Sequence, residues 1–300
     1  MRFPALLPIF AIGCLFASEP VAYRQSDGTE VYLPCRPQRV VVANASLAKV
    51  WDLVGGTAVA VPAVKSQEAL PETMRGLPSC GSAVMPNLER VLAFRPDLVL
   101  LADRMAAQRQ IAEQIRGMGI AAASVKYHNY EDFLGLLGIF ARLNGKLSEE
   151  IPRVLEIQEK VEAICRQTKG KPAPSVAILF ASTHGFELEG NATNTGTMVR
   201  MLGGRNILGE KVAGHLQFSY EQFLLENPEV ILVVSMGNGS ALKKKVESEL
   251  ASQSTWKMLR AVKSCRVHFL PPELSLYTPG PDFPAAFQML YQLLYPETAQ

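Results

Sequence analysis

The pattern of apolar and polar positions alternates, in the first half of the chain, between short apolar runs and amphipathic segments. Short runs rich in Val, Ile and Leu indicate buried strands, whereas apolar residues at helical spacing indicate helices. The Asp27-Gly28 turn signal predicts a hairpin near the start, and Ser46 is the expected N-cap of the first helix. Strands that alternate with helices favour a parallel sheet covered by helices. The predicted strands are residues 39–43, 57–61, 97–102 and 120–125, and the predicted helices are residues 47–54, 106–118 and 130–143.

The alternation stops at residues 148–168, where the apolar spacing predicts one long helix. The expected fold is α/β, with two parallel-sheet, Rossmann-like lobes joined by this single long helix. Because bending a helix breaks its hydrogen bonds, such a connection predicts little lobe closure. The expected units are residues 18–145, a connection at 146–171, and residues 172–300. The later strands are expected at residues 176–181, 230–234 and 266–270, and the later helices at 195–202, 241–251, 255–262 and 284–294.

One sequence pattern occurs twice, beginning at Glu89 and at Glu221. Each copy has a Glu, a short amphipathic helix, a Pro seven residues after the Glu, an acid and an apolar run. The Pro ends the helix and moves the residue before it out of the α region. Since the copies are about 130 residues apart, far beyond the roughly 20–50-residue period of solenoids, they predict two similar lobes.

Residues 1–17 have the features of an export signal. Arg2 is their only charge, and the apolar stretch after it is too short to span a bilayer. The segment Ala11-Ile12-Gly13-Cys14 resembles the lipobox of bacterial lipoproteins, which makes Cys14 a candidate for lipidation. Cleavage of a plain secretory signal near residue 17 is the alternative. Both interpretations place the protein in the periplasm or on the outer face of the cytoplasmic membrane.

Composition narrows the classes of function. The 300-residue chain has a net charge of +2 and scattered basic residues, which gives no reason to expect nucleic-acid binding. It has no nucleophile elbow, phosphate loop or paired His-Glu helix motif, so neither an enzyme nor an intrinsic cofactor is expected. Four cysteines besides Cys14 allow three disulfide pairings, and the sequence does not choose among Cys35, Cys80, Cys165 and Cys265.

Several motifs, in their order and spacing, give the chain a resemblance to one family. They are Arg39-Val40-Val41, Leu77-Pro78 with Gly81, and residues 87–99, 227–231 and 256–271. Over residues 30–296 the chain resembles the solute-binding proteins of ABC importers for ferric siderophores, haem and cobalamin. The resemblance implies a rigid, monomeric, two-lobed protein that grips its ligand between the lobes. Such a protein delivers the ligand to the permease without chemical conversion.

Glu89 and Glu221 stand where, by this resemblance, each lobe pairs with arginine residues of the permease. Two identical acids at the starts of two equivalent helices also suit a partner with two-fold symmetry. The alternative is that both acids only stabilise the N-termini of their helices, an effect of about 0.3–1 kcal/mol each. That alternative explains an acid at each place but not the whole repeated segment.

Ligands of open α/β sheets bind beyond the carboxyl ends of the strands. Arg104 follows a predicted strand, where siderophore-binding members of the family carry a cation for the anionic chelate, although an Arg there can simply be solvated. Tyr127 and Tyr277 are candidates for stacking on a flat ligand or for covering the edge of the core. The full set of candidate ligand-binding residues is Asn44, Ser46, Ala83, Met85, Arg104, Tyr127, His215 and Tyr277.

His215 lies six residues before Glu221, in the loop that touches the ligand in haem- and cobalamin-binding members of the family. The equivalent position in the first lobe is Ala83, with Met85 close by. Because Met and His both ligate haem iron, Met85 and His215 are a candidate axial pair if the cargo is haem. The alternatives are an ordinary surface or core role for His215 and simple packing of Met85 beside Pro86.

A zinc- or manganese-binding solute-binding protein is the alternative function. Such a site needs about three His residues and a carboxylate in the cleft. The sequence has four His residues, at 128, 184, 215 and 268, and it offers Asn44 rather than a His after the first strand. The expected cargo is therefore an iron chelate, either a ferric siderophore or haem, or else a corrinoid. The metal content of the purified protein would distinguish these alternatives.

Overall fold

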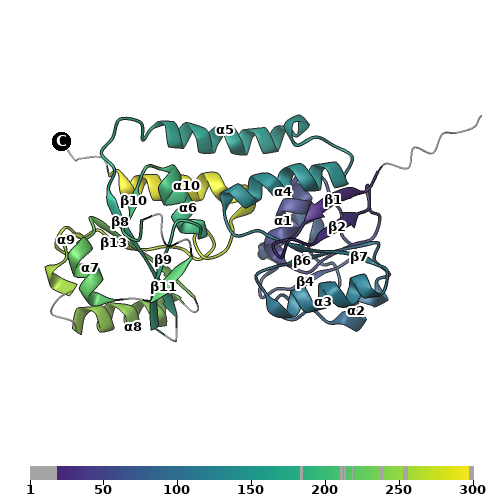
Figure 1. The fold of residues 1–300 in the computed structure, drawn as a ribbon, viewed down its shortest axis with the longest axis horizontal. Coiled ribbons are helices and arrows are strands. Elements are labelled where there is room, and N and C mark those ends of the chain that lie inside the picture. The colour runs from purple at the N-terminus through teal and green to yellow at the C-terminus, as the bar shows by residue number, and fades with distance from the viewer. Residues whose placement is uncertain are drawn as a thin grey trace, which may run out of the picture.

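The computed structural model describes residues 19–182, 185–209, 212, 214–217, 219–236, 239–252 and 256–296. The expected signal peptide, with Cys14, lies outside the described residues. Figure 1 shows two α/β lobes side by side, with one helix, α5 (Pro152–Arg166), running over both. Within the described residues, no helix is both long and apolar enough to cross a membrane.

The N-terminal lobe is built on a parallel sheet. Strands β3 (Val40–Val42), β6 (Leu98–Ala102) and β7 (Ala121–Val125) are adjacent in that order, and their apolar residues are almost wholly buried. A parallel pair, β4 (Val61–Ala63) and β5 (Ser79–Ser82), joins β3 through a bridge between Val41 and Ala60. The predicted hairpin is confirmed as β1 (Val21–Arg24) and β2 (Glu30–Leu33). The helices are α1 (Ala45–Leu53), α2 (Leu88–Ala93), α3 (Ala106–Gly117) and α4 (Tyr130–Leu143), with 3-10 turns at Gln67–Ala69 and Glu72–Met74.

The C-terminal lobe has a mixed sheet with the order β11-β9-β8-β12-β13, in which β10 (Arg205–Asn206) also pairs with β8. Strands β8 (Ser175–Ser182), β12 (Val230–Ser235) and β13 (Val267–Phe269) are parallel, as predicted. The sequence analysis missed β9 (Gly185–Glu189) and β11 (His215–Gln217), which are antiparallel additions at one edge. The helices are α6 (Asn194–Met201), α7 (Tyr220–Glu226), α8 (Gly239–Ser252), α9 (Arg260–Lys263) and α10 (Phe283–Leu294), with 3-10 turns at Trp256–Met258 and Gly280–Asp282.

Two helix predictions need correction. The predicted helix at residues 148–168 is shorter, because Pro152 is the first residue of α5 and Ile151 before it is extended, with φ −98° and ψ 106°. A proline restricts the preceding residue to extended conformations, so Ser148–Glu150 form a separate 3-10 turn. The predicted helix at residues 255–262 is instead the 3-10 turn Trp256–Met258 followed by α9.

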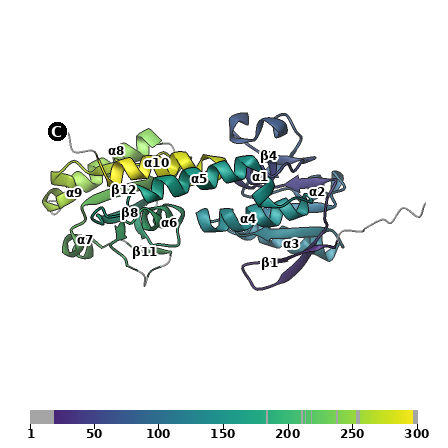
Figure 2. The ribbon, with the colours of Figure 1, turned by 90° about the horizontal axis from the view of Figure 1, so that it is seen from above.

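The two lobes share one hydrophobic core. Helix α10 lies against α5 (Figure 2), and its Phe283 and Phe287 pack on α4 of the N-terminal lobe. The ring centroid of Phe283 lies 4.9 Å from that of Tyr130 and 5.1 Å from that of Phe133. Separating the lobes would expose these rings to water, and the apolar area so exposed opposes large lobe motion.

The repeated sequence pattern forms the same local structure in both lobes. Each copy is a short helix, α2 or α7, that leads into a buried parallel strand, β6 or β12. The residue before each Pro has left the right-handed helical region, as predicted: φ is +47° at Arg95 and +40° at Asn227. This left-handed residue ends the helix and turns the chain toward the strand.

The acid after each Pro ties the repeat to the neighbouring strand. The Asp97 carboxylate accepts hydrogen bonds from the backbone N–H groups of Gln38, at 2.6 Å, and Arg39, at 2.9 Å. In the other lobe, the Glu229 carboxylate accepts from the backbone N–H of Ser175 at 2.8 Å. The two copies are therefore equivalent in three dimensions, and their first acids, Glu89 and Glu221, occupy equivalent places.

The cysteines form no disulfide among the four that the structure describes. Cys80 is buried, Cys35 and Cys165 are partly exposed, and Cys265 is exposed, and all four are free thiols. The fold is held by its shared apolar core, without a covalent cross-link between these residues.

Candidate ligand-binding cleft

A cleft between the lobes contains two hollows that share Arg104 and Leu276. The larger has a volume of about 580 Å³ and is lined by both lobes, with Arg104 and His128 on one side and Phe180, Glu189, Thr193 and His215 on the other. The smaller has a volume of about 90 Å³ and is lined by Asn44, Ser46, Arg104, Tyr127, Tyr277 and their neighbours. The larger volume lies within the roughly 300–1,000 Å³ typical of small-molecule sites.

The start of α1 forms one wall of the smaller hollow. Ser46 is not the N-cap, because the Asn44 side chain has that role: its Oδ1 accepts from the backbone N–H groups of Ser46, at 2.9 Å, and Leu47, at 3.2 Å. Asn44 is extended, with φ −143° and ψ 133°, as an N-cap must be, whereas Ser46 is already helical. Asn44 thus fixes the helix start, and Ser46 lines the hollow.

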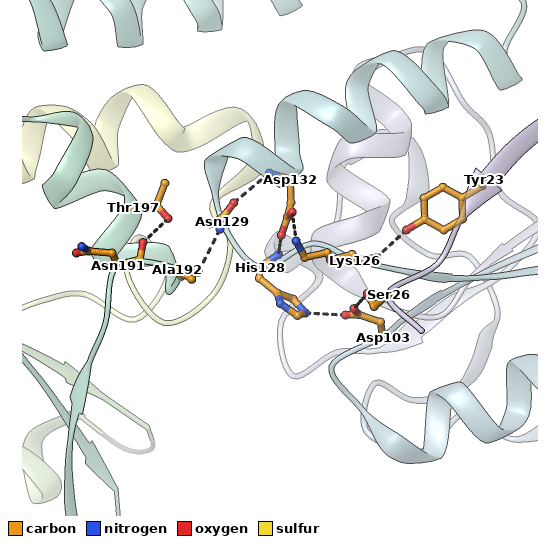
Figure 3. Close-up of polar contacts among 10 residues, drawn as sticks. All are labelled: Tyr23, Ser26, Asp103, Lys126, His128, Asn129, Asp132, Asn191, Ala192 and Thr197. Carbon is orange, nitrogen blue, oxygen red and sulfur yellow. Dashed lines mark hydrogen bonds and ion pairs between the residues drawn. The ribbon is translucent and has the colours of Figure 1, made fainter. Parts of the chain in front are cut away.

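Asp103 and His128 form a polar contact beside Arg104. Nε2 of His128 lies 2.6 Å from Oδ1 of Asp103, and the Ser26 hydroxyl donates to Oδ2 at 2.5 Å (Figure 3). Burial raises the pKa of Asp103, but hydrogen bonds from His128 and Ser26 outweigh burial and hold the pKa below its ordinary value. Asp103 is therefore a carboxylate engaged by local partners. The exposed Arg104, which lines both hollows, is left available to an anion in the cleft.

The loop that carries His128 also joins the lobes. Nδ2 of Asn129 donates to the backbone oxygen of Ala192, in the other lobe, at 3.1 Å (Figure 3). Asp132 accepts from the backbone N–H of His128 at 2.8 Å, and its other oxygen lies 3.0 Å from Nζ of Lys126. These contacts fix the position of the loop that carries His128, which lines the larger hollow.

The opposite wall is one face of the β8-β9-β11 sheet. Phe180 is opposite Glu187, and Glu189 is opposite His215, in the antiparallel register. Because side chains two residues apart point to the same face, Phe180, Glu187, Glu189 and His215 share one face. Three of them, Phe180, Glu189 and His215, line the larger hollow.

His215 is oriented by two neighbours on this face. Its Nδ1 lies 3.1 Å from Oε2 of Glu187, and its ring meets the ring of Phe180 edge-on, with centroids 5.2 Å apart. Metal-ligating histidines commonly direct one ring nitrogen to a carboxylate, which fixes the tautomer and makes the other nitrogen a better ligand. With Nδ1 held by Glu187, Nε2 is the nitrogen of His215 that can bind a metal.

Glu189 is a cleft residue that the sequence analysis missed. The residue is 5% exposed, and the Thr193 hydroxyl donates to Oε2 at 3.0 Å. Burial raises the pKa of Glu189 to about 7, although the Thr193 hydrogen bond and the charge of Arg104 lower it. The sequence offered one signal for Glu189, which is that Glu187 and Glu189 alternate with an apolar Leu, as residues of a strand do. That signal could be used only if β9 had been predicted as a strand.

Met85 and Ala83 are the predicted ligand contacts that do not line either hollow. Met85 is 66% exposed in a turn where its backbone N–H donates to the Ser82 hydroxyl at 3.0 Å. The backbone oxygen of Ala83 accepts from the Gln108 side chain. The structure therefore places His215, but not Met85, at the larger hollow.

The two tyrosines have different environments. Tyr127 is only 8% exposed, and its ring stacks on Phe133 with centroids 6.2 Å apart, so most of the ring packs on the core although the residue also lines the smaller hollow. Burial is also what raises the pKa of the Tyr127 phenol. Tyr277 is 57% exposed at the rim of the smaller hollow and is accessible to a ligand.

A site for a bare metal ion requires several ligands close together. Among the residues that the structure describes, no group of three or more His, Cys, Asp or Glu side chains could hold one. Of the four histidines, His184 lies outside the described residues, and His268 lines a separate hollow on the C-terminal lobe.

Comparison with known proteins places this architecture in a family. The high-affinity heme uptake system protein IsdE of Staphylococcus aureus is 23% identical over 263 residues, which cover 86% of this chain and 87% of that protein. Its structure with heme matches with a TM-score of 0.73, at 20% identity, over 86% of this chain and 98% of that one.

Two further solved structures share the fold. An ABC transporter substrate-binding protein from Listeria monocytogenes EGD-e matches with a TM-score of 0.78, at 20% identity, over 86% of this chain and 99% of that one. The vitamin B12 binding protein BtuF of Vibrio cholerae matches with a TM-score of 0.69, at 15% identity, over 87% and 98%. The family model described as periplasmic binding protein matches residues 40–274, and on that match the chain belongs to the periplasmic binding protein family.

Proposed function

We propose that this protein is the substrate-binding component of an ABC import system, which captures an iron chelate or a corrinoid between its lobes and passes it to the permease. The names of its relatives support this function: a heme uptake protein, a vitamin B12 binding protein and an ABC transporter substrate-binding protein. The zinc or manganese alternative is not favoured, because none of these relatives is described as a carrier of either ion. Binding without chemical conversion is the whole of the proposed activity.

Haem is the cargo that the cleft geometry favours within this class. The observation that carries this choice is His215, whose Nδ1 lies 3.1 Å from a Glu187 oxygen while its ring lines a hollow of about 580 Å³. An imidazole fixed in this way is a suitable axial ligand for haem iron. Arg104, on the opposite wall, offers a guanidinium to an acidic group of the cargo.

A titration followed by visible absorption tests this choice. Residues 19–300 are titrated with haemin, beside the variants His215→Ala and His268→Ala. His268 is the matched control, because it is a histidine of the same lobe that lines a different hollow. We expect a sharp Soret band for the wild type and the control, and a shifted or weakened band for His215→Ala. Equal spectra for all three proteins would remove His215 as the iron ligand.

A ferric siderophore or a corrinoid is the second candidate cargo, and Arg104 is the observation that favours it. Arg104 lines both hollows, and the adjacent Asp103 is already engaged by His128. A cation placed in this way suits an anionic chelate whether or not a histidine binds the metal. If haemin produces no Soret change, binding of ferric siderophores by wild type and Arg104→Gln becomes the deciding comparison.

We propose that Glu89 and Glu221 dock the protein on the permease. Each is exposed and is the second residue of an equivalent short helix, α2 or α7, one in each lobe (Figure 1). Both helices end at a left-handed residue before a Pro, so the two acids are presented by the same local scaffold. A pair of equivalent carboxylates suits arginines on two equivalent permease subunits.

Uptake of labelled cargo by membrane vesicles that contain the cognate permease tests the docking proposal. We expect Glu89→Ala and Glu221→Ala each to reduce uptake at least fivefold and to leave cargo affinity unchanged. Glu226→Ala is the matched control, because Glu226 is an exposed acid at the other end of α7. Equal uptake by all variants would mean that the acids only stabilise their helices.

We propose, finally, that the protein is exported and held at the membrane surface by a lipid on Cys14. The support is the sequence Ala11-Ile12-Gly13-Cys14 after a short apolar stretch. Mass spectrometry of the membrane fraction should find a diacylglyceryl group on Cys14, and Cys14→Ser should move the protein to the soluble fraction. An unmodified N-terminus near residue 18 would instead support a plain secretory signal.

A further inference from the structure

Strand β13 forms an open edge of the C-terminal sheet. It lies at the other end of the strand order from β11, and among the described strands it pairs with β12 alone. Arg266 and Leu270, at its two ends, direct their backbone to β12: the Arg266 oxygen accepts and the Leu270 N–H donates, each at 2.9 Å. Because backbone groups of successive strand residues point to alternate sides, those of Val267 and Phe269 point away from β12. They offer donors and acceptors with which another strand can pair.

A hollow of about 610 Å³ lies beside this edge. Its lining includes all three residues of β13, together with Lys243 and Glu247 of α8 and Met289 and Leu293 of α10. Helices α8 and α10 pack on opposite faces of the sheet, in separate cores, with β13 between them (Figure 1). There is therefore room beside the edge on both faces of the sheet.

The ends of β13 leave one symmetric register for a second copy of the same strand. Cys265 and Pro271 lie at equal distances on either side of His268; Cys265 is left-handed, with φ +54°, and Pro271 has no N–H group. If two copies run antiparallel with His268 opposite His268, Val267 of each copy is opposite Phe269 of the other. Both are then hydrogen-bonded pairs, in which the two residues exchange both N–H···O bonds. A register centred on Val267 or Phe269 would instead bring Cys265 or Pro271 into the ladder.

The charges beside the edge follow the direction of α8. Lys243 lies over the Phe269 ring, with Nζ 5.1 Å from its centroid, and Glu247 is one helical turn further along, with an oxygen 3.9 Å from that Nζ. Because α8 connects the adjacent parallel strands β12 and β13, it runs opposite to β13. One turn of about 6 Å therefore brings Glu247 level with Val267.

These charges complement themselves in the symmetric register. Since Phe269 of one copy is opposite Val267 of the other, Lys243 of each copy is level with Glu247 of the second copy. Helix α8 packs over β12, so the two helices would be about 14 Å apart, three strand spacings, which long Lys and Glu side chains can span. Both side chains are 52% exposed and free to turn toward the second copy. The pairs within each copy and between copies would form one network of alternating charge.

We propose that two copies of the protein associate through β13, about a two-fold axis at His268, to form one continuous sheet. A second copy is the occupant that the edge fits, because both the register and the charges are self-complementary. The pairing differs from the monomer that the family resemblance implies, and it is independent of the proposed cargo. Because β11, which carries His215, is at the opposite edge of the sheet, the cleft stays open in the pair of copies.

Sedimentation equilibrium of residues 19–300, at protein concentrations up to about 1 mM, tests the association. We expect reversible dimers for the wild type. Lys243→Glu and Glu247→Lys should each weaken them at least about tenfold, because each puts like charges across the axis. An equimolar mixture of the two variants should restore dimers, since every pair across the axis then has opposite charges. The pair within each chain stays broken in the mixture, so the restoration reports on contact between copies.

Val267→Pro tests the strand pairing itself. The Val267 N–H points away from β12, so a Pro there removes bonds between copies and none within the sheet. We expect dimers at least about tenfold weaker. Val267→Ala is the matched control, because it also shortens the side chain but keeps the N–H, and it should associate as the wild type does. Thermal melts establish that each variant is folded.

Three results would overturn the inference. One is a wild type that stays monomeric over the whole range of concentration, which would leave the edge to a different occupant. Another is equal association of the wild type, both charge variants and Val267→Pro, which would place the contact on another surface. The third is a mixture of the charge variants that stays monomeric, which would exclude the symmetric register. Each of these results leaves the proposed function standing, because no residue of the cleft is changed.

Discussion

Phe283 is the residue through which we expect the two lobes to be held together. It belongs to α10, is fully buried, and meets Tyr130 and Phe133 of α4 in the other lobe with centroid distances of 4.9 and 5.1 Å. Replacing it by Ala removes the ring from the core that the lobes share. If this core limits lobe motion, the variant should be less stable and also less rigid between the lobes.

The expected cost follows from the burial of the ring. A fully buried Phe→Ala change costs about 3–5 kcal/mol, which includes the cavity that remains. The lost aromatic contacts, each worth about 0.5–1.5 kcal/mol, place Phe283→Ala at the upper end of that range. Whole domains are stable by only about 5–15 kcal/mol. Phe283→Leu, which keeps an apolar side chain at this position and should cost about 1.5 kcal/mol, provides a milder variant for comparison.

Urea unfolding and small-angle scattering together separate stability from rigidity. The matched control is Phe223→Ala, since Phe223 is equally buried, at 1% exposure, but lies in a core of the C-terminal lobe alone. We expect both alanine variants to lose about 3–5 kcal/mol. Only Phe283→Ala should also increase the radius of gyration of the folded protein. An unchanged radius, or a loss below about 1 kcal/mol, would refute a core that spans both lobes.

Three further outcomes are expected. Gly196→Ala should weaken cargo binding at least tenfold, because a Cβ there would collide with the backbone oxygen of Gly190 and move the residues after Glu189; unchanged affinity would show that this wall is not part of the site. Asp103→Asn should make the free energy of unfolding decrease less steeply with falling pH below about pH 4. The depressed pKa of Asp103 stabilises the fold at neutral pH, and this stabilisation is lost as pH falls through that pKa. An unchanged slope would mean that Asp103 titrates as it does when unfolded. Scattering of free and haemin-loaded protein should differ little, and a large compaction would contradict rigid lobes.

The repeated pattern was the part of the fold that the sequence predicted most firmly. Its signals were local and chemical: a Pro that ends a helix, an acid beside it and a buried apolar run. The structure confirmed both helices and both strands, with Arg95 and Asn227 in the left-handed region. The pattern could be recognised because each signal acts on its own neighbours and needs no knowledge of distant residues.

The sheet edge in the C-terminal lobe was missed for the opposite reason. Strand β9 is five residues long and contains Gly185 and two glutamates, so it lacks a long apolar run. It is a strand because its partners, β8 and β11, complete its hydrogen bonds, and this is a tertiary effect. Glu189 could not be selected as a cleft residue without that strand.

The candidate site was predicted in part. The location of ligand sites at strand ends led to Arg104, Ser46 and Tyr277, which the structure brings together at the smaller hollow because the topology of a parallel sheet fixes where those loops meet. Their contact with a ligand stays a prediction. Location at a strand end could not show that the Tyr127 ring turns inward to stack on Phe133, since side-chain direction depends on packing. The proposed pairing of Met85 with His215 stays a prediction that only a ligand-bound structure can test.

The most direct test of a cargo site between the lobes is the position of iron in crystals of residues 19–300 grown with haemin. Anomalous differences measured at the iron edge locate the metal without reference to any assumed pose. We expect one strong peak in the larger hollow, within bonding distance of Nε2 of His215 and between His215 and Arg104. A peak elsewhere, such as the hollow of about 610 Å³ beside His268 and α8, would contradict the proposed site.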